Sequence, residues 1–109
     1  MISLDYVAGL FDGEGTIYYD KRCNRYIVRI TNTNLEALQI VRDFLNMGRI
    51  YVDMRKGKKI YNLQIAKKSD VRRFIELMRN KCIIKRQRIE EYMRWLNNSQ
   101  MSVNSVAEL

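Results

Sequence analysis

The chain has 109 residues, 47% of them hydrophobic, and carries a formal net charge of +8 with a pI near 9.7. This length suits one domain with one core. The absence of histidine excludes His-based zinc sites and Ser-His or Cys-His triads. Two cysteines, Cys23 and Cys82, are too few for a disulfide framework, and the apolar run from Val7 to Phe11 is too short for a signal peptide or a membrane span.

These exclusions predict an intracellular protein with reduced thiols, in the cytoplasm of a prokaryote or in an organelle. The richness in Lys, Arg, Ile and Tyr is typical of thermophilic proteins. A net charge of +8 on so small a domain indicates a polyanionic partner, most often nucleic acid. The alternative is a solvated basic surface without a specific partner.

The first three elements follow from apolar periodicity and turn residues. Residues 3–12 are predicted to form a helix that Ser3 caps at its N-terminus. Residues 16–31 are predicted to form a hairpin, because β-branched and aromatic residues flank a polar turn near residues 21–24. Residues 34–48 are expected to be helical, with Asn34 as the N-cap and Gly48 as the stop signal.

The remainder of the chain repeats the hairpin and the helix. We expect a hairpin over residues 49–66 that turns at 55–58, a helix over 69–81 with Ser69 as its cap, a last helix over 85–97, and a short flexible tail over 98–109. The order αββαββαα predicts one α+β domain over residues 1–97. Its four-stranded antiparallel sheet carries helices on one face.

The other face of this sheet is open, and alternation along the strands indicates which side chains it presents. The core-facing set is predicted to be Ile17, Tyr19, Tyr26, Val28, Ile30, Ile50, Val52, Met54, Tyr61, Leu63 and Ile65. The outward-facing set is predicted to be Tyr18, Asp20, Arg22, Arg25, Ile27, Arg29, Tyr51, Asp53, Arg55, Asn62 and Gln64. Arg, Asn and Gln form bidentate contacts with base edges and phosphates, so the polar outward residues are candidate DNA contacts. The alternative is that these residues are polar only because this side of the sheet faces solvent, without binding a partner.

The stretch VAGLFDGEG, residues 7–15, combines an apolar helical run with two acids and two glycines that alternate at its end. Asp12 and Glu14 lie two residues apart, so they do not share a helical face. Carboxylates at a helix C-terminus oppose the helix dipole. Two of them there indicate a purpose other than helix stability.

This stretch resembles the signature of the LAGLIDADG homing endonucleases. Ala8, Gly9, Leu10, Asp12 and Gly15 match letter for letter, and Glu14 stands for the final acid. The expected order of elements is also that family's order, so the resemblance covers about residues 4–97. It implies a site-specific endonuclease that cuts both strands of a long pseudo-palindromic DNA target by metal-dependent phosphodiester hydrolysis. Because the sequence holds one copy of the motif, the resemblance implies a homodimer.

The resemblance also implies roles for individual residues. Glu14 is expected to bind Mg²⁺ with its side chain, with help from the carbonyl of Gly13, while Asp12 buttresses the helix ends. Lys85 is expected near the scissile phosphate and Asn32 in the water network, which makes Glu14, Lys85 and Asn32 the candidate catalytic residues. The expected dimer interface consists of Val7, Ala8, Gly9, Leu10, Asp12 and Gly13.

Two alternatives remain at this stage. The same fold can serve as a non-cleaving DNA- or RNA-binding module of the maturase type. If the motif match is accidental, the chain is a basic structural protein. The expected partners are double-stranded DNA and a second copy of the chain, with no membrane and no small-molecule cofactor besides the divalent cation.

Overall fold

The computed structural model describes the backbone of residues 2–108 and the side chains of residues 2–98. Four helices and four strands alternate in the predicted order αββαββαα. They are α1 (Leu4–Glu14), β1 (Gly15–Asp20), β2 (Arg25–Asn32), α2 (Leu35–Leu45), β3 (Arg49–Arg55), β4 (Lys58–Ile65), α3 (Lys68–Met78) and α4 (Arg86–Glu108). The architecture is α+β, as the sequence predicts.

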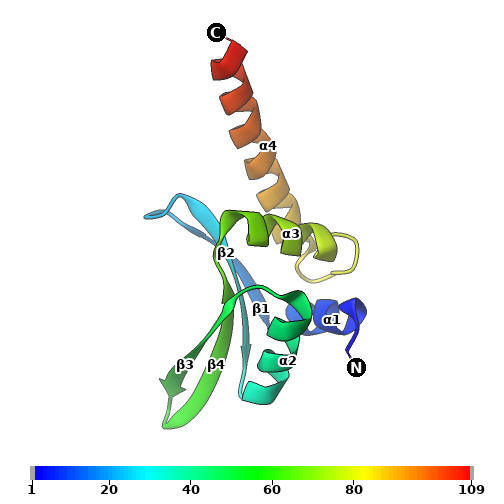
Figure 1. The fold of residues 1–109 in the computed structure, drawn as a ribbon, viewed down its shortest axis with the longest axis vertical. Helices are drawn as coiled ribbons and strands as arrows, with labels where there is room; N and C mark the ends of the chain where they lie inside the picture. The colour runs from blue at the N-terminus through cyan, green and yellow to red at the C-terminus, as the bar shows by residue number, and fades with distance from the viewer. Residues whose placement is uncertain (1, 109) are drawn as a thin grey trace.

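The strands form one antiparallel sheet in the order β1-β2-β4-β3. The two hairpins therefore meet at β2 and β4, with Val28 opposite Ile65 and Asn32 opposite Tyr61. Helices α1, α2 and α3 lie on one side of the sheet, and α4 extends away from the body of the molecule (Figure 1). Within residues 2–108, the other face of the sheet carries no helix (Figure 1).

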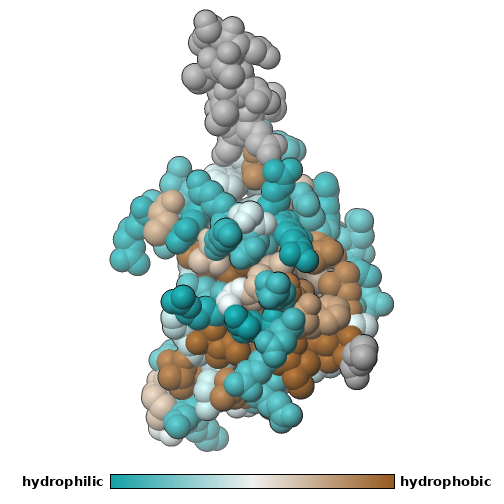
Figure 2. All heavy atoms as spheres, in the orientation of Figure 1, coloured by the Kyte–Doolittle hydropathy of each residue, from teal (hydrophilic) through white to brown (hydrophobic). Residues whose placement is uncertain are grey.

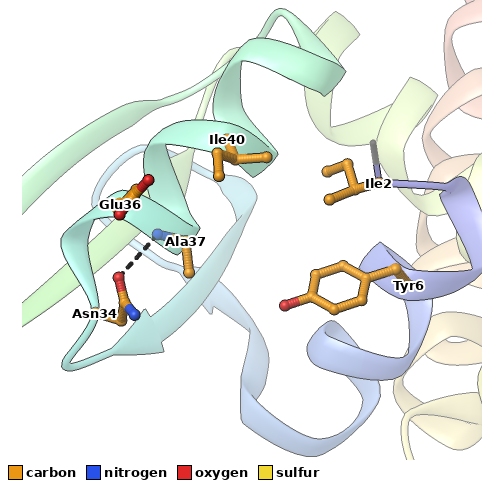
Figure 3. A pocket seen from close by; sticks show the side chains of 6 residues that line it. All are labelled: Ile2, Tyr6, Asn34, Glu36, Ala37 and Ile40. Carbon is orange, nitrogen blue, oxygen red and sulfur yellow. Dashed lines mark hydrogen bonds between the residues drawn. The ribbon is translucent and has the colours of Figure 1, made fainter.

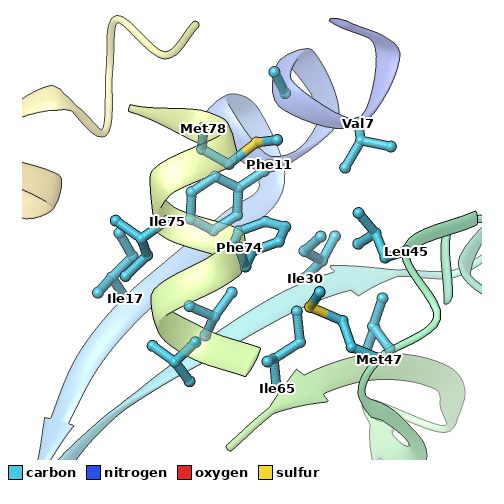
Figure 4. Packing of buried hydrophobic residues seen from close by; sticks show 14 of the residues in the cluster. Val7, Phe11, Ile17, Ile30, Leu45, Met47, Ile65, Phe74, Ile75 and Met78 are labelled. Carbon is cyan, nitrogen blue, oxygen red and sulfur yellow. The ribbon is translucent and has the colours of Figure 1, made fainter. Parts of the chain in front are cut away.

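A continuous apolar core fills the space between the sheet and the helices (Figure 4). Phe11 of α1 meets Phe74 of α3 edge to face, with ring centroids 4.9 Å apart. Ile30 of β2 and Ile65 of β4 are fully buried beneath them. Burial of such side chains stabilises a fold by about 1.5–3 kcal/mol each, so this cluster dominates the stability of the domain.

Helix boundaries agree with the sequence where a side chain caps the helix. The Ser3 hydroxyl accepts a hydrogen bond from the Tyr6 amide, and Asn34 Oδ1 accepts one from the Ala37 amide. Helix α2 ends earlier than predicted, since Asn46 adopts the left-handed conformation (φ 54°) and terminates it before Gly48. The N-cap of α3 is Lys67 rather than Ser69, and no side chain caps this helix end.

The prediction of core-facing residues in β3 is largely wrong. Val52 is 62% exposed and Met54 is 57% exposed, whereas Ile50 is half-buried against the core. Strand β3 lies at the sheet edge, and its far end extends beyond α2 (Figure 1). The opposite error occurs at Ile27, which is predicted to lie on the open face but is only 4% exposed.

Helix α4 starts at Arg86, one residue later than predicted, and its backbone stays helical to Glu108. It thus includes most of the segment predicted as a tail, whose flexibility stays a prediction. No helix within the described residues is long and apolar enough to cross a membrane.

Candidate active site and nucleic-acid interface

Glu14 occupies the last position of α1, directly before β1, and its side chain is exposed. The chain passes from helix to strand without a loop because Gly15 has no side chain. A Cβ at Gly15 would lie 2.2 Å from the Phe11 ring and 2.5 Å from the Phe11 carbonyl oxygen. Gly15, the final glycine of the motif, therefore fixes where β1 begins. It thereby also fixes the position of Glu14 at that end of the sheet.

Asp12 faces the loop before α4 rather than solvent. Its carboxylate accepts hydrogen bonds from the amides of Ile83 (3.0 Å), Ile84 (3.1 Å) and Lys85 (2.9 Å). The Lys85 ammonium in turn donates to the Asp12 carbonyl oxygen at 3.0 Å. Asp12 thus ties the end of α1 to the start of α4, which agrees with the buttressing role expected of it.

These contacts make Asp12 a pH-dependent contributor to stability. Burial raises the pKa of Asp12, but the amides of Lys85, Ile83 and Ile84 and the Lys85 charge outweigh it and lower the pKa below 3.8. A lowered pKa in the folded state stabilises the protein above the unfolded pKa, and this contribution is lost as pH falls through the folded pKa. We expect Asp12→Asn to cost about 1 kcal/mol at pH 7, since a neutral amide accepts weaker hydrogen bonds.

Urea unfolding of the wild type and of Asp12→Asn at pH 7 and near pH 3 measures this effect. The difference between the two proteins should shrink at the lower pH, because the unfolded wild-type chain then takes up a proton at Asp12 that the folded state disfavours. A difference that stays constant over this range would contradict the role of the Asp12 charge.

Contacts and strand register place the three candidate catalytic residues toward the same end of the sheet, while their joint role stays a prediction. Lys85 is held against Asp12, two residues before Glu14. Gly15 pairs with Ile30 across β1 and β2, so Asn32, two residues further along β2, lies at the same end as Glu14. Asn32 Oδ1 also accepts a hydrogen bond from the Asn34 amide at 2.9 Å, which fixes its side chain in the turn before α2.

The end of α1 offers two oxygen donors, the exposed Glu14 carboxylate and the Gly13 carbonyl, which have the hard character that Mg²⁺ prefers. No group of three or more His, Cys, Asp or Glu side chains that could hold a metal ion occurs in the described part of the chain. The two donors fit Mg²⁺, which usually takes one or two carboxylates and completes its coordination with phosphate and water oxygens.

The outer side of α1 offers a surface for a second copy. An added Cβ at Gly9 or Gly13 would have no neighbour within 4 Å, so both glycines face open space. Of the predicted interface residues, Val7 and Ala8 are buried in the chain's own core, whereas Leu10 is half-buried. The Val7 and Ala8 side chains are thus used within the chain, while an interface through the rest of the motif stays a prediction.

The open sheet face carries a preorganised arginine. Arg29 Nη2 donates to the Tyr18 hydroxyl and to Gln64 Oε1, both at 3.1 Å, and the guanidinium lies 5.3 Å from the centroid of the Tyr18 ring. Its Nε is buried without a hydrogen-bond partner among the described residues. Three strands thus hold the guanidinium in place while leaving part of its donor capacity unused.

Most of the predicted DNA contacts lie around this arginine. A hollow of about 430 Å³ is lined by Arg29, Tyr51, Val52, Asp53, Asn62 and Gln64. Asn62 is only 8% exposed, and its Oδ1 accepts a hydrogen bond from the Thr31 hydroxyl at 2.7 Å. Asn62 is therefore better placed to orient Thr31 than to touch a partner.

Arg22, Arg25 and Arg55, which were also predicted to contact DNA, do not line this hollow. Arg22 lies in the β1–β2 turn with a 95% exposed side chain and a 4.0 Å ion pair to Asp20. Arg55 pairs with Asp53 at the far end of β3. Arg25 lines a cavity with residues of α3 and α4, on the helix-covered side.

Three further residues lie opposite open-face positions and were missed by the sequence reading. The strand registers place Thr16 opposite Arg29, Thr31 opposite Asn62 and Arg49 opposite Gln64. Continuing the alternation to the first residues of β1 and β3 and to the end of β2 would have found them.

Apolar side chains are exposed elsewhere as well. Hydrophobic residues gather over α1 and α2 in Figure 2. On α2, Ile40 and Phe44 are 44% and 45% exposed. A small cavity of about 160 Å³ separates the start of α1 from α2, with Ile2, Tyr6 and Ile40 among its lining residues (Figure 3). This cavity is lined by residues other than Glu14, Lys85 and Asn32.

Comparisons with known proteins agree with this fold. Residues 2–79 match the family model of the LAGLIDADG-like domain. The fold is similar to that of the homing endonuclease I-TnaI, with a TM-score of 0.75 and 21% identity over 93% of this chain and 76% of that one. No match was found among curated proteins.

Two other solved structures share the fold. The archaeal intron-encoded homing endonuclease I-Vdi141I, complexed with DNA, has a TM-score of 0.62 and 18% identity over 97% of this chain and 76% of its own. I-CvuI, bound to the I-CreI target in the presence of Mg with the DNA not cleaved, has a TM-score of 0.60 and 15% identity. The match to I-CvuI covers 80% of this chain and 60% of that one.

The motif and the αββαββα order of elements agree with this match. The chain belongs to the family of LAGLIDADG-like domains, and it shares its fold with the homing endonucleases named above.

Proposed function

We propose that the chain is a site-specific endonuclease that acts as a homodimer on double-stranded DNA and requires Mg²⁺. The proposal is supported by the exposed Glu14 side chain at the end of α1, two residues after Asp12, whose carbonyl oxygen accepts a hydrogen bond from Lys85. Glu14 and Asn32 also lie toward the same end of the open sheet, as the pairing of Gly15 with Ile30 requires. The structure of I-Vdi141I, which has a similar fold, is that of a complex with DNA.

Each residue has a distinct part in this proposal. Glu14 and the Gly13 carbonyl hold the divalent cation, which when bound supplies an activated water and Lewis-acid stabilisation of charge. Lys85, fixed by Asp12, places a cation where it stabilises negative charge on the phosphate. Asn32 orients water at the same end of the sheet.

The dimer follows from the glycines of α1. Gly9 and Gly13 let two copies of the helix approach backbone to backbone, which places the two Glu14 side chains side by side. One strand of about eight residues spans roughly 26 Å and follows about eight base pairs. Two sheets therefore cover a pseudo-palindrome of about 16–22 base pairs.

Selection of bound duplexes from a randomised DNA library, with and without Mg²⁺, tests the proposal. The proposal expects recovered sites with two-fold symmetry and cut fragments only when the metal is present. Symmetric sites that stay intact with Mg²⁺ would favour a non-cleaving module of the same fold, and enrichment of no sequence would contradict specific recognition altogether.

Recognition should depend on Arg29 more than on other arginines. Because Tyr18 and Gln64 fix its guanidinium, we expect Arg29→Ala to cost about 1–3 kcal/mol of binding and to relax preference at one symmetric pair of positions. Arg22→Ala is the matched control, since its exposed side chain in the turn should weaken binding slightly and uniformly. Binding measured on a panel of single-base variants separates these results, and a uniform loss for Arg29→Ala would mark a phosphate contact.

A further inference from the structure

A second cavity, of about 310 Å³, lies on the helix-covered side of the molecule. It is lined by Arg25, Tyr26, Lys68, Ser69, Val71, Arg72, Tyr92, Trp95 and Leu96, which come from β2, α3 and α4. It shares no residue with the candidate active site. Its volume is at the small end of the range of about 300–1,000 Å³ that is typical of small-molecule sites.

Aromatic rings form one wall of this cavity. Trp95 packs against Tyr26 with ring centroids 5.2 Å apart, and Tyr92 lies 5.9 Å from the same indole. Burial raises the pKa of Tyr26 and of Tyr92 above the ordinary value, so both hydroxyls stay protonated and able to donate hydrogen bonds. Aromatic side chains of this kind stack on any planar base.

Positive charge lies beside the aromatic wall. Arg25, Lys68 and Arg72 line the cavity, and no carboxylate does so among the described residues. Arg72 pairs with Glu76 at 3.1 Å, whereas Arg25 Nε is buried without a hydrogen-bond partner in the described part of the chain. Helix α3 begins at Lys68, and its N-terminus lacks a side-chain cap. A free helix N-terminus with adjacent cations favours an anion such as phosphate.

We infer that this cavity binds a single nucleotide, with the base against Tyr26, Tyr92 and Trp95 and the phosphate at Arg25, Lys68 and the start of α3. The nucleotide is either a free nucleoside monophosphate or an unpaired nucleotide of a single strand. Helix α3, which lines the cavity, lies on the side of the sheet opposite the open face, so the cavity is separate from a duplex on that face. The inference stands independently of the proposed cleavage.

The chain's one tryptophan, Trp95, reports on this site directly. We expect nucleoside monophosphates to quench its fluorescence saturably, after correction for absorbance with free tryptophan amide. Nucleosides without phosphate and inorganic phosphate should each bind about tenfold more weakly, because each makes only part of the contacts. A short single-stranded oligonucleotide that binds more tightly than the monophosphates would identify a strand as the source, and the reverse order would identify free nucleotide.

Two variants test the position of the ligand. Lys68→Gln should weaken binding about tenfold, whereas Lys58→Gln removes the same charge at the start of β4, outside the lining, and should change it by about twofold or less. Ser69→Phe should fill the cavity and abolish quenching, with the thermal midpoint confirming that the variant is folded. No saturable quenching at millimolar nucleotide, equal binding of nucleoside and monophosphate, or equal effects of Lys58→Gln and Lys68→Gln would each overturn the inference.

Discussion

Replacing Glu14 by Gln should abolish DNA cleavage, by at least about a hundredfold, and leave DNA binding largely intact. The amide keeps the size of the side chain but loses the charge that holds a divalent cation. Affinity instead comes from the basic groups and the sheet face around Arg29, which this change does not touch. A gel shift and a cleavage assay on one selected duplex measure both quantities.

Glu36→Gln is the matched control for this substitution. Glu36 is an exposed acid in the first turn of α2, and the change removes the same charge away from Glu14. It should leave cleavage within about twofold of the wild type, as expected for a surface substitution. Persistent cutting by Glu14→Gln would remove Glu14 from the metal site.

Replacing Gly9 by Leu should abolish dimerisation and cleavage together. A Cβ at Gly9 meets nothing within 4 Å in the chain itself, so the monomer should fold normally. The added side chain would clash only with the backbone of a second helix packed against α1. Sedimentation of the variant at assay concentrations should therefore show the 13.1 kDa monomer, while the wild type sediments as a dimer.

Gln39→Leu separates this effect from the addition of apolar surface. Gln39 is exposed on α2, so this variant adds the same side chain at an exposed helical position that is not part of α1. It should remain dimeric and active. Dimers of Gly9→Leu would show that the two copies meet elsewhere.

Much of the fold could be predicted because local signals and burial agree. Ser3 and Asn34 cap their helices as predicted, and alternation identified Val28, Ile30 and Leu63 as core residues. The errors arise where position in the sheet matters. Alternation gives the face of Val52 and Met54 but not whether a helix covers that end of an edge strand.

The candidate site was only partly predictable for a related reason. The motif itself identifies Glu14 and Gly15, since both act within a few residues of one another. The hydrogen bonds that the Asp12 carboxylate accepts from the amides of residues 83–85 join segments more than 70 residues apart, so no local pattern reveals them. The arrangement of Arg29 with Gln64 likewise depends on the pairing of β2 with β4.

Incubation of the selected duplex with the wild-type chain, with Mg²⁺ and with a chelator in its place, tests the central claim most directly. Strand-specific sequencing gels report where each strand is cut. The account predicts cuts on both strands at positions related by the two-fold axis of the site, and only when the metal is present. A duplex that is bound yet stays intact with Mg²⁺, or one that is cut equally with chelator, would contradict it.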